Sequence, residues 1–309
     1  MKKIGIFIAT LGILSSLMVG CQKKEALDYT LKFGVLPAES AIPIIIAKQQ
    51  GFYEKEGLNV ELVPFQSPND RNVAVQGGQI DAIIADVMTS LTFYEGDVKM
   101  KITSDINEDF KLLTSPHSGI DSFEKLNDKK VSIVPNFVLE YIMDEMAKEN
   151  DITYQVVSIP SFTARFEALL SDQIDGVIFT EPQATLLIEK GAKLLATSKE
   201  YGIKAGTLLF NEAVLTDQPE EVKAFYKAYN EAVDYINTTE PAEYSDVLSQ
   251  YGFPEEVKDY LSGEVTYTQA QKITDETFES VLEWTKTKGL TKKTYTLEEI
   301  SDFSFIEQE

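Results

Sequence analysis

Short apolar runs alternate with amphipathic segments along the chain from about residue 30 to residue 210. The runs have the length and the β-branched content of buried strands, whereas the segments between them place apolar residues on one helical face. Strands that alternate with helices are typical of an α/β architecture. The predicted strands are 31–36, 59–65, 80–85, 99–103, 110–114, 131–134, 154–159, 176–179, 193–196 and 207–210.

The segments between these strands are predicted to be helices. The first of them contains three successive isoleucines, Ile44 to Ile46, which give it only moderate intrinsic helix propensity. After residue 210 the pattern changes to helices without intervening strands, and Gly289 ends the last of these. The predicted helices are 41–50, 69–76, 87–94, 122–127, 139–149, 163–171, 182–190, 221–237, 254–261 and 269–288.

Two stretches of the chain, 71–84 and 165–178, align without a gap at an offset of 94 residues. Both copies begin with an arginine, and both read as a helix, a tight turn and a buried strand. The strand ends at Asp86 in one copy and at Thr180 in the other. The repeat predicts two lobes that are versions of one unit.

We therefore expect two α/β lobes joined by two crossings, with a ligand cleft between them. The first lobe is predicted to comprise 30–115 and 208–309, and the second 116–207. The strands at 193–196 and 207–210 are expected to complete the second sheet and the return crossing.

Ligands of open α/β sheets bind beyond the carboxyl ends of the strands, so the loops at these ends should line the cleft. Ser40, Asn136 and Thr180 can equally be interpreted as helix N-caps. The candidate ligand-binding residues are Glu39, Ser40, Ser67, Asp86, Met88 and Thr89 from the first lobe, and Asn136, Phe137, Phe162, Thr180 and Glu181 from the second.

The first twenty residues have the anatomy of a secretory signal peptide. Lys2 and Lys3 precede an apolar run at 4–20, and Cys21, the only cysteine of the chain, follows directly. The run ending at Cys21 resembles a bacterial lipobox, although an ordinary signal with an accidental cysteine is the alternative. We expect lipidation of Cys21, a polar tether over 21–29, and a location on the outer face of a bacterial cell membrane.

Charge and composition narrow the function further. The net charge is −22, which excludes a general nucleic-acid binder because such a protein needs a basic face. His117 is the only histidine and is interpreted as an ordinary loop residue. With one histidine, and with Cys21 used by the anchor, a histidine–cysteine zinc site is not expected. We expect no catalytic residue, metal or cofactor.

Several segments resemble the nitrate/sulfonate/taurine-type substrate-binding proteins, the NMT1/THI5-like group. The most specific is 46–62 (IAKQQGFYEKEGLNVEL), followed in order by 77–82, 119–133, 180–182 and 218–230. The resemblance implies a periplasmic-binding-protein fold of type II. It also implies a monomer that captures a small molecule and delivers it to the permease and ATPase of an ABC importer.

The sequence departs from two ligand patterns of that group. Oxyanion binders often carry small hydroxyl residues where this chain has Asn136 and Phe137, and pyrimidine-precursor binders carry an Asp-Trp-x-Pro-Asn stretch that is absent after the first strand. Glu39, Asp86 and Glu181 place three carboxylates near the predicted cleft, and they would repel an anion unless they are paired or turned away. These charges predict a neutral or cationic organic ligand, with Phe137 or Phe162 stacking on it.

Two other functions stay open. The same fold includes enzymes of pyrimidine-precursor and menaquinone biosynthesis, and the synthase type needs an active-site histidine and a cysteine-rich motif, whereas this chain has one residue of each kind. A ligand-sensing partner of a membrane receptor could have the same sequence features. A binding protein needs no covalent step, because the ligand stabilises the closed arrangement of the lobes by contacting both.

Overall fold

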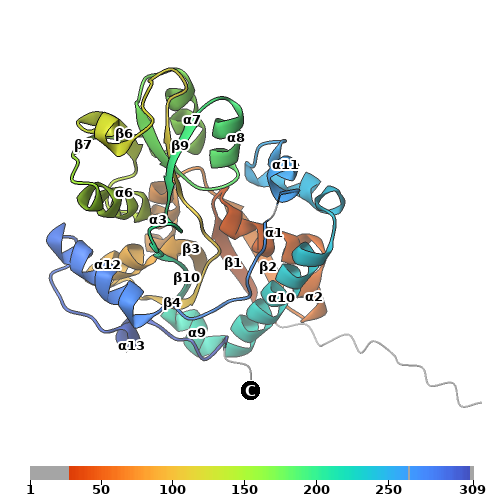
Figure 1. Ribbon diagram of the computed structural model, residues 1–309. Helices are drawn as coiled ribbons and strands as arrows, with labels where there is room; N and C mark the ends of the chain where they lie inside the picture. Colours follow the sequence, from red (N-terminus) through yellow and green to blue (C-terminus); the bar gives the residue numbers. More distant parts are fainter. Residues whose placement is uncertain (1–27, 264, 307–309) are drawn as a thin grey trace, which may run out of the picture.

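The computed structural model describes residues 28–263 and 265–306, which form two mixed β-sheets covered by helices (Figure 1). The predicted signal peptide, Cys21 and all but the end of the predicted tether lie outside the described residues. The first sheet contains β1 (Thr30–Val35), β2 (Asn59–Pro64), β3 (Ala82–Asp86), β4 (Met100–Asp105) and β10 (Gly206–Asn211). The second contains β5 (Lys111–Thr114), β6 (Lys129–Ile133), β7 (Tyr154–Ser158), β8 (Gly176–Phe179) and β9 (Lys193–Thr197).

The two sheets have the same topology. Their strand orders are β2-β1-β3-β10-β4 and β7-β6-β8-β5-β9. In each sheet three strands are parallel, and the fourth in the order is antiparallel to both of its neighbours. We call the first sheet with its helices the first lobe and the second sheet with its helices the second lobe. The predicted fold class, two α/β lobes joined by two crossings, is confirmed.

The antiparallel strand of each sheet is the strand that enters directly from the other lobe. β5 follows the first crossing, at 106–110, and β10 follows the second, at 198–205. The sequence boundary at residue 115 placed the 110–114 strand in the first lobe, and the strand at 207–210 was expected to complete the second sheet and the crossing. β5 instead belongs to the second sheet, where it pairs with β8 and β9. β10 pairs with β3 and β4 in the first sheet, which agrees with the predicted lobe boundary at residue 208 and not with a place in the second sheet.

Figure 1 shows the second lobe above the first, with helices on the faces of both sheets. The helices of the second lobe are α5 (Phe123–Leu126), α6 (Val138–Glu149), α7 (Phe162–Leu170) and α8 (Gln183–Glu189). Those of the first lobe are η1 (Glu39–Ala41), α1 (Ile42–Gln49), α2 (Phe52–Lys55), α3 (Pro68–Gln76), α4 (Val87–Glu95), α9 (Glu212–Asp217), α10 (Pro219–Thr238), η2 (Pro241–Glu243), η3 (Ser245–Tyr251), α11 (Val257–Leu261), α12 (Asp275–Thr287) and α13 (Leu297–Ile300).

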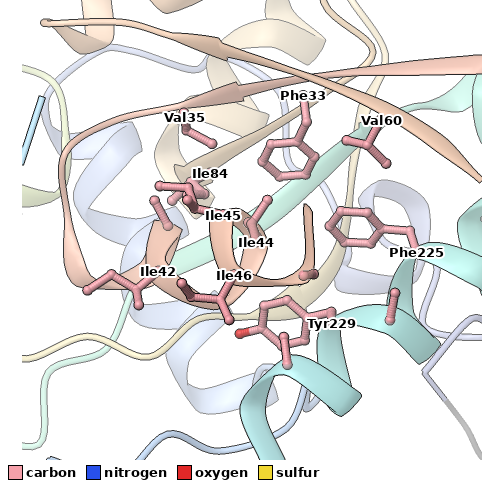
Figure 2. Close-up of a cluster of buried hydrophobic side chains, with 14 of the residues drawn as sticks. Phe33, Val35, Ile42, Ile44, Ile45, Ile46, Val60, Ile84, Phe225 and Tyr229 are labelled. Carbon is pink, nitrogen blue, oxygen red and sulfur yellow. The ribbon is translucent and has the colours of Figure 1, made fainter. Parts of the chain in front are cut away.

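The largest core of the first lobe forms between β1, α1 and α10. Figure 2 shows the isoleucines of α1 beside the rings of Phe33, Phe225 and Tyr229. The Phe33 and Phe225 rings are stacked with their centroids 5.2 Å apart. Helix α1 is buried on every side through Ala47, so burial of its β-branched side chains outweighs their moderate helix propensity.

The internal repeat appears in the structure as matching contacts. Asp81 and Asp175 are equivalent, and each ties the turn before its strand to the neighbouring strand. The Asp81 carboxylate accepts from the Lys32 amide at 2.8 Å, and the Asp175 carboxylate accepts from the Lys130 amide at 2.9 Å. In both copies the aspartate amide donates back to the same lysine carbonyl at 2.9 Å. The two lobes are therefore built on the same local hydrogen-bond scheme.

The helix predicted at 269–288 is shorter than expected. Residues 269–274 are irregular, and α12 begins only after Thr274, whose hydroxyl caps the helix by accepting from the Thr277 amide. The amides of the preceding segment bond elsewhere: Ala270 donates to Asn230 and Gln271 donates to Asp105. These long-range partners stabilise an extended backbone where the local pattern favours a helix.

The two crossings are tied to each other beside the sheet. The Glu108 carboxylate of the first crossing accepts from the amides of Ala205 and Gly206, at 2.9 and 3.0 Å. A β-carbon on Gly206 would lie 2.4 Å from both the Glu108 carboxylate and the Ile106 side chain. Both groups are side-chain ends and can move, but Glu108 can do so only by leaving the amides that it accepts from. A glycine is therefore required at position 206.

The substitution Gly206→Ala should lower the free energy of unfolding by about 1–3 kcal/mol, because the methyl group overpacks the crossings and displaces Glu108. Urea denaturation measures the loss. Gly96→Ala is the matched control, since its β-carbon would meet its nearest neighbour at an ordinary 3.5 Å. Equal stability of the two variants would contradict the assigned role of Gly206.

Candidate ligand-binding cleft

A cleft between the lobes encloses about 640 Å³ of space, part of it open to solvent. It lies beyond the carboxyl ends of β1, β3, β6 and β8 and is also bordered by the first crossing and by the first turns of α3 and α7. Most of the lining is apolar, as it is in sites for small organic molecules. The lining residues are Leu36, Ala38, Ser40, Pro68, Arg71, Ile84, Ala85, Asp86, Ile106, Asn107, Glu108, Phe110, Val134, Phe137, Val138, Leu139, Phe162, Arg165 and Thr180.

Asp86 joins the two lobes at the cleft. One carboxylate oxygen accepts from the Thr89 amide at 2.8 Å and so caps α4 of its own lobe. The other accepts from the Val138 amide at 3.2 Å, at the start of α6 in the opposite lobe. The amino ends of two helices therefore converge on one buried carboxylate, and their partial positive charges stabilise it. Burial acts in the opposite sense and raises the pKa of Asp86.

Five of the eleven candidate residues line the cleft, namely Ser40, Asp86, Phe137, Phe162 and Thr180. Six do not. Met88 is fully buried in the core of the first lobe, and the hydroxyl of Ser67 caps α3. Asn136 is exposed, and its backbone N–H donates to the Glu140 carboxylate. The remaining three are Thr89, which donates to Asp86, and the carboxylates Glu39 and Glu181.

The alternative roles of Ser40, Asn136 and Thr180 as N-caps are not seen. Ser40 lies inside η1, and the N-caps of α6 and α8 are Phe137 and Pro182, neither of which caps with its side chain. The reason is local: Asp86 accepts from the first amide of α6, and the Glu181 carboxylate accepts from the Thr185 amide of α8.

Glu39 and Glu181 lie at a second, more polar cavity behind the crossings. The Glu39 carboxylate accepts from the Tyr260 hydroxyl and from the Asp109 amide, both at 2.7 Å. The Glu181 carboxylate is paired with the ammonium group of Lys111. The prediction of a neutral or cationic ligand rested on three free carboxylates in the cleft. All three are engaged by the protein, and Glu39 and Glu181 lie outside the cleft, so Asp86 is the only one of the three that brings negative charge to it.

Arg71 and Arg165, the first residues of the two repeat copies, both line the cleft and are each only 2% exposed. Neither arginine directly follows a strand, so neither is among the predicted ligand-binding residues. A signal was nevertheless present, since an arginine recurs at the same position of both copies of the repeat.

A further set of contacts joins α12 of the first lobe to α6 of the second, which lie side by side (Figure 1). The Trp284 indole donates to Asp144 at 2.9 Å and packs edge-on against Tyr141, with the ring centroids 5.6 Å apart. The Lys288 ammonium group is 2.8 Å from Glu140 and 2.7 Å from Asp144. Together with Asp86, these contacts describe a closed arrangement of the lobes.

His117 lies away from the cleft, with its side chain 76% exposed and paired with Asp172 at 3.0 Å. Over residues 28–263 and 265–306, no cluster of histidine, cysteine, aspartate and glutamate side chains is arranged to hold a metal ion. Within the same residues, no helix combines the length and the apolar character needed to cross a bilayer.

The two lobes and the cleft between them have the periplasmic-binding-protein fold. The chain belongs to the family described as NMT1/THI5 like, which matches residues 39–243. Among solved structures it is similar to a ligand-binding component of an ABC-type import system from Staphylococcus aureus, with a TM-score of 0.75, 15% identity, and coverage of 89% of this chain and 97% of that one.

Two other similarities point in different functional directions. The periplasmic aliphatic sulphonate-binding protein SsuA of Escherichia coli aligns with a TM-score of 0.71 at 14% identity, covering 88% of this chain and 91% of that one. A 4-amino-5-hydroxymethyl-2-methylpyrimidine phosphate synthase of Saccharomyces cerevisiae is 24% identical over 282 residues, covering 83% of this chain and 80% of the relative. Identities this low establish the shared fold and leave the ligand open.

Glu39 makes the free energy of unfolding depend on pH. Burial raises the pKa of Glu39 from 4.5 to about 8, although the hydrogen bonds from Tyr260 and Asp109 lower it. The folded protein therefore retains a proton that the unfolded chain releases. The stability from this group is complete below about pH 4.5 and is lost as the pH rises through 8. Each pH unit within this window should cost at most about 1.4 kcal/mol.

The substitution Glu39→Gln should reduce this slope, because an amide does not titrate. Urea denaturation across the same pH window measures the slope for the wild type and the variant. Glu243→Gln serves as the control, since Glu243 is exposed on the surface of the first lobe. If Glu39→Gln kept the wild-type slope, Glu39 would not be the group that retains the proton.

Proposed function

We propose that this protein is an extracytoplasmic solute-binding lipoprotein that captures a small organic molecule in the inter-lobe cleft and delivers it to an ABC importer. The observation that carries the proposal is the cleft itself, an apolar space at the carboxyl ends of strands from both lobes, bordered by Asp86 as it bonds across to Val138. The similarity to import-system components supports the transport role.

Closure of the lobes supplies the mechanism. A molecule that contacts both lobes adds its interaction energy to the closed arrangement only, so it shifts the population toward that arrangement. The inter-lobe bonds of Asp86 and the α6–α12 contacts favour closure from within the protein. The permease can then distinguish loaded from empty protein by the relative position of the lobes.

The second candidate is an enzyme of pyrimidine-precursor synthesis, which the similarity to the yeast synthase favours. A synthase of this type would use an active-site histidine, whereas His117 is exposed outside the cleft. This position favours binding over catalysis. A ligand-sensing partner of a membrane receptor would share the cleft and would differ only in the protein that it contacts.

Small molecules that co-purify with the native protein decide between binding and catalysis. The protein is purified without denaturation, the bound molecules are released and identified by mass spectrometry, and each is added back to emptied protein in a calorimeter. We expect one molecule to rebind and to be recovered unchanged. Recovery of a chemically converted product would support the enzyme instead.

The anchor is tested separately with Cys21→Ser. Burial of acyl chains contributes about 0.8 kcal/mol per methylene, and a stable anchor takes two lipid signals. Without the thiol we expect the protein to move from the membrane fraction to the medium, as followed by immunoblotting of the fractions. Incorporation of labelled fatty acid into Cys21→Ser at the wild-type level would contradict lipidation at this residue.

Lys288→Gln should loosen the closed arrangement of the ligand-free protein. The substitution removes the cation that α6 carboxylates share with α12, and we expect a cost of about 1 kcal/mol, or about five times more open protein. Trp284 is 7% exposed at this contact and is the only tryptophan of the chain, so quenching of its fluorescence by acrylamide should increase.

Lys286→Gln is the matched control on the same helix, because Lys286 bonds to Thr294 within the first lobe. It should leave the quenching at the wild-type level. Equal quenching in both variants would show that the Lys288 ion pairs do not hold the lobes together.

A further inference from the structure

The two buried arginines of the cleft occupy equivalent positions but have unequal surroundings. Each of the three nitrogens of Arg71 has an acceptor within its own lobe. One of its terminal nitrogens donates to the Ile84 carbonyl at 2.6 Å, and its other two nitrogens donate to the Asn72 side chain at 3.0 and 2.8 Å. The negative charge of Asp86 also acts on the Arg71 guanidinium. Arg71 therefore has both acceptors and a countercharge inside the protein.

Arg165 has lost these partners. At the offset of 94 residues, Phe166 replaces Asn72 and Thr180 replaces Asp86. One terminal nitrogen of Arg165 donates to the Ile159 carbonyl at 3.0 Å, and the buried Nε finds no acceptor among the described residues. The second copy of the repeat thus has the arginine but lacks the side chains that neutralise it in the first copy.

Two aromatic rings hold the Arg165 guanidinium in place. Its central carbon lies 4.5 Å from the ring centroid of Phe179 and 5.1 Å from that of Phe162. Cation–π contacts of this kind fix the guanidinium but do not supply an acceptor for its N–H groups. Burial alone lowers the pKa of Arg165 to about 9, with no acidic side chain acting against the shift.

A buried charge without a partner is costly, and an arginine does not relieve the cost by releasing its proton. A ligand with an acceptor oxygen would remove the cost at the moment of binding, and a charged oxygen would do so most effectively. Asp86 lines the same cleft, so a second negative charge on the ligand would be repelled. Phe110 and Phe137 border the remaining space with apolar surface.

We infer that Arg165 is the specificity-determining residue of the cleft and that it selects a monoanionic organic ligand, one acidic oxygen group attached to an apolar body. The inference rests on the proposed solute-binding function and deepens it by assigning the charge of the ligand. Arg71 has the same residue type and burial, but it is neutralised within the first lobe and takes no part in the selection.

The test uses probe pairs of matched shape and different charge, benzoate with benzamide and hexanoate with hexanamide, and isophthalate as a dianion. Binding to the full chain is followed by Trp284 fluorescence and by the shift in unfolding temperature, at constant ionic strength. Wild-type protein should bind the two monoanions at least about tenfold more tightly than the amides. Isophthalate should bind more weakly than benzoate.

Arg165→Gln should remove the preference for the monoanions, whereas Arg165→Lys should keep part of it because the charge remains. The ligand-free Arg165→Gln protein should unfold at or above the wild-type temperature, since the substitution removes an uncompensated buried charge. A merely structural arginine would behave differently. Its loss would lower the unfolding temperature and leave the ratio of carboxylate to amide affinity unchanged.

Thr180→Asp provides a second test that leaves Arg165 in place. It restores, in the second lobe, the carboxylate that the first lobe has at Asp86, and the new charge should compete with the ligand for Arg165. Thr180→Asn has the same shape without the charge. We expect the preference for benzoate over benzamide to disappear in Thr180→Asp and to persist in Thr180→Asn. Equal preferences in the two variants would overturn the inference.

Failure of this inference is distinguishable from failure of the proposed function. If the amides bind the wild type as tightly as the carboxylates, Arg165 does not select charge, although the cleft still binds solute. If no probe binds, or if the molecule that co-purifies is neutral or cationic, the ligand class is wrong. The proposed function itself fails only if nothing co-purifies and rebinds unchanged.

Discussion

The main-chain hydrogen bonds of β10, which lies antiparallel between β3 and β4, fix the end of the second crossing in the sheet of the first lobe. Without this strand β4 would have no partner in the sheet, and β5 has the corresponding position in the second sheet. Because each crossing leads directly into a strand of the other sheet, the two crossings lie side by side, and Glu108 accepts from the amides around Gly206. Pairing of β10 with β3 also sets Gly206 opposite Asp86, so the floor of the cleft is positioned by sheet pairing and not by flexible loops.

The charges at the cleft follow a division between the two repeat copies. Asp86 accepts from the amino ends of α4 in its own lobe and α6 in the opposite lobe, and its charge also offsets that of Arg71 within the first lobe. Arg165 is held between aromatic rings and has no acidic partner. In the first copy of the repeat, Arg71 has acceptors and a countercharge within its own lobe, whereas in the second copy Arg165 has no countercharge. The difference rests on the residues that replace Asn72 and Asp86.

The sequence was sufficient for the architecture because that depends on patterns within one segment. Alternating strands and helices, and the repeat at an offset of 94 residues, predicted two α/β lobes with a cleft between them. Side-chain orientation was beyond such patterns. Glu39 was placed in the correct loop, but its carboxylate turns toward Tyr260, 221 residues along the chain. The sheet membership of the 110–114 strand likewise depended on pairing with β8 and β9, which no local pattern specifies.

The position of β10, which completes the first sheet but follows the second lobe in the chain, also imposes an order on folding. During synthesis the first sheet remains without β10 until the whole second lobe has been made, and α12, which closes on α6, is later still. Contacts of such long sequence separation slow folding, because the chain must be closed into large loops before they form. A protein exported before it folds would cross the membrane well ahead of its last strand pairing. The inter-lobe cleft is therefore complete only after the whole of both lobes has been made.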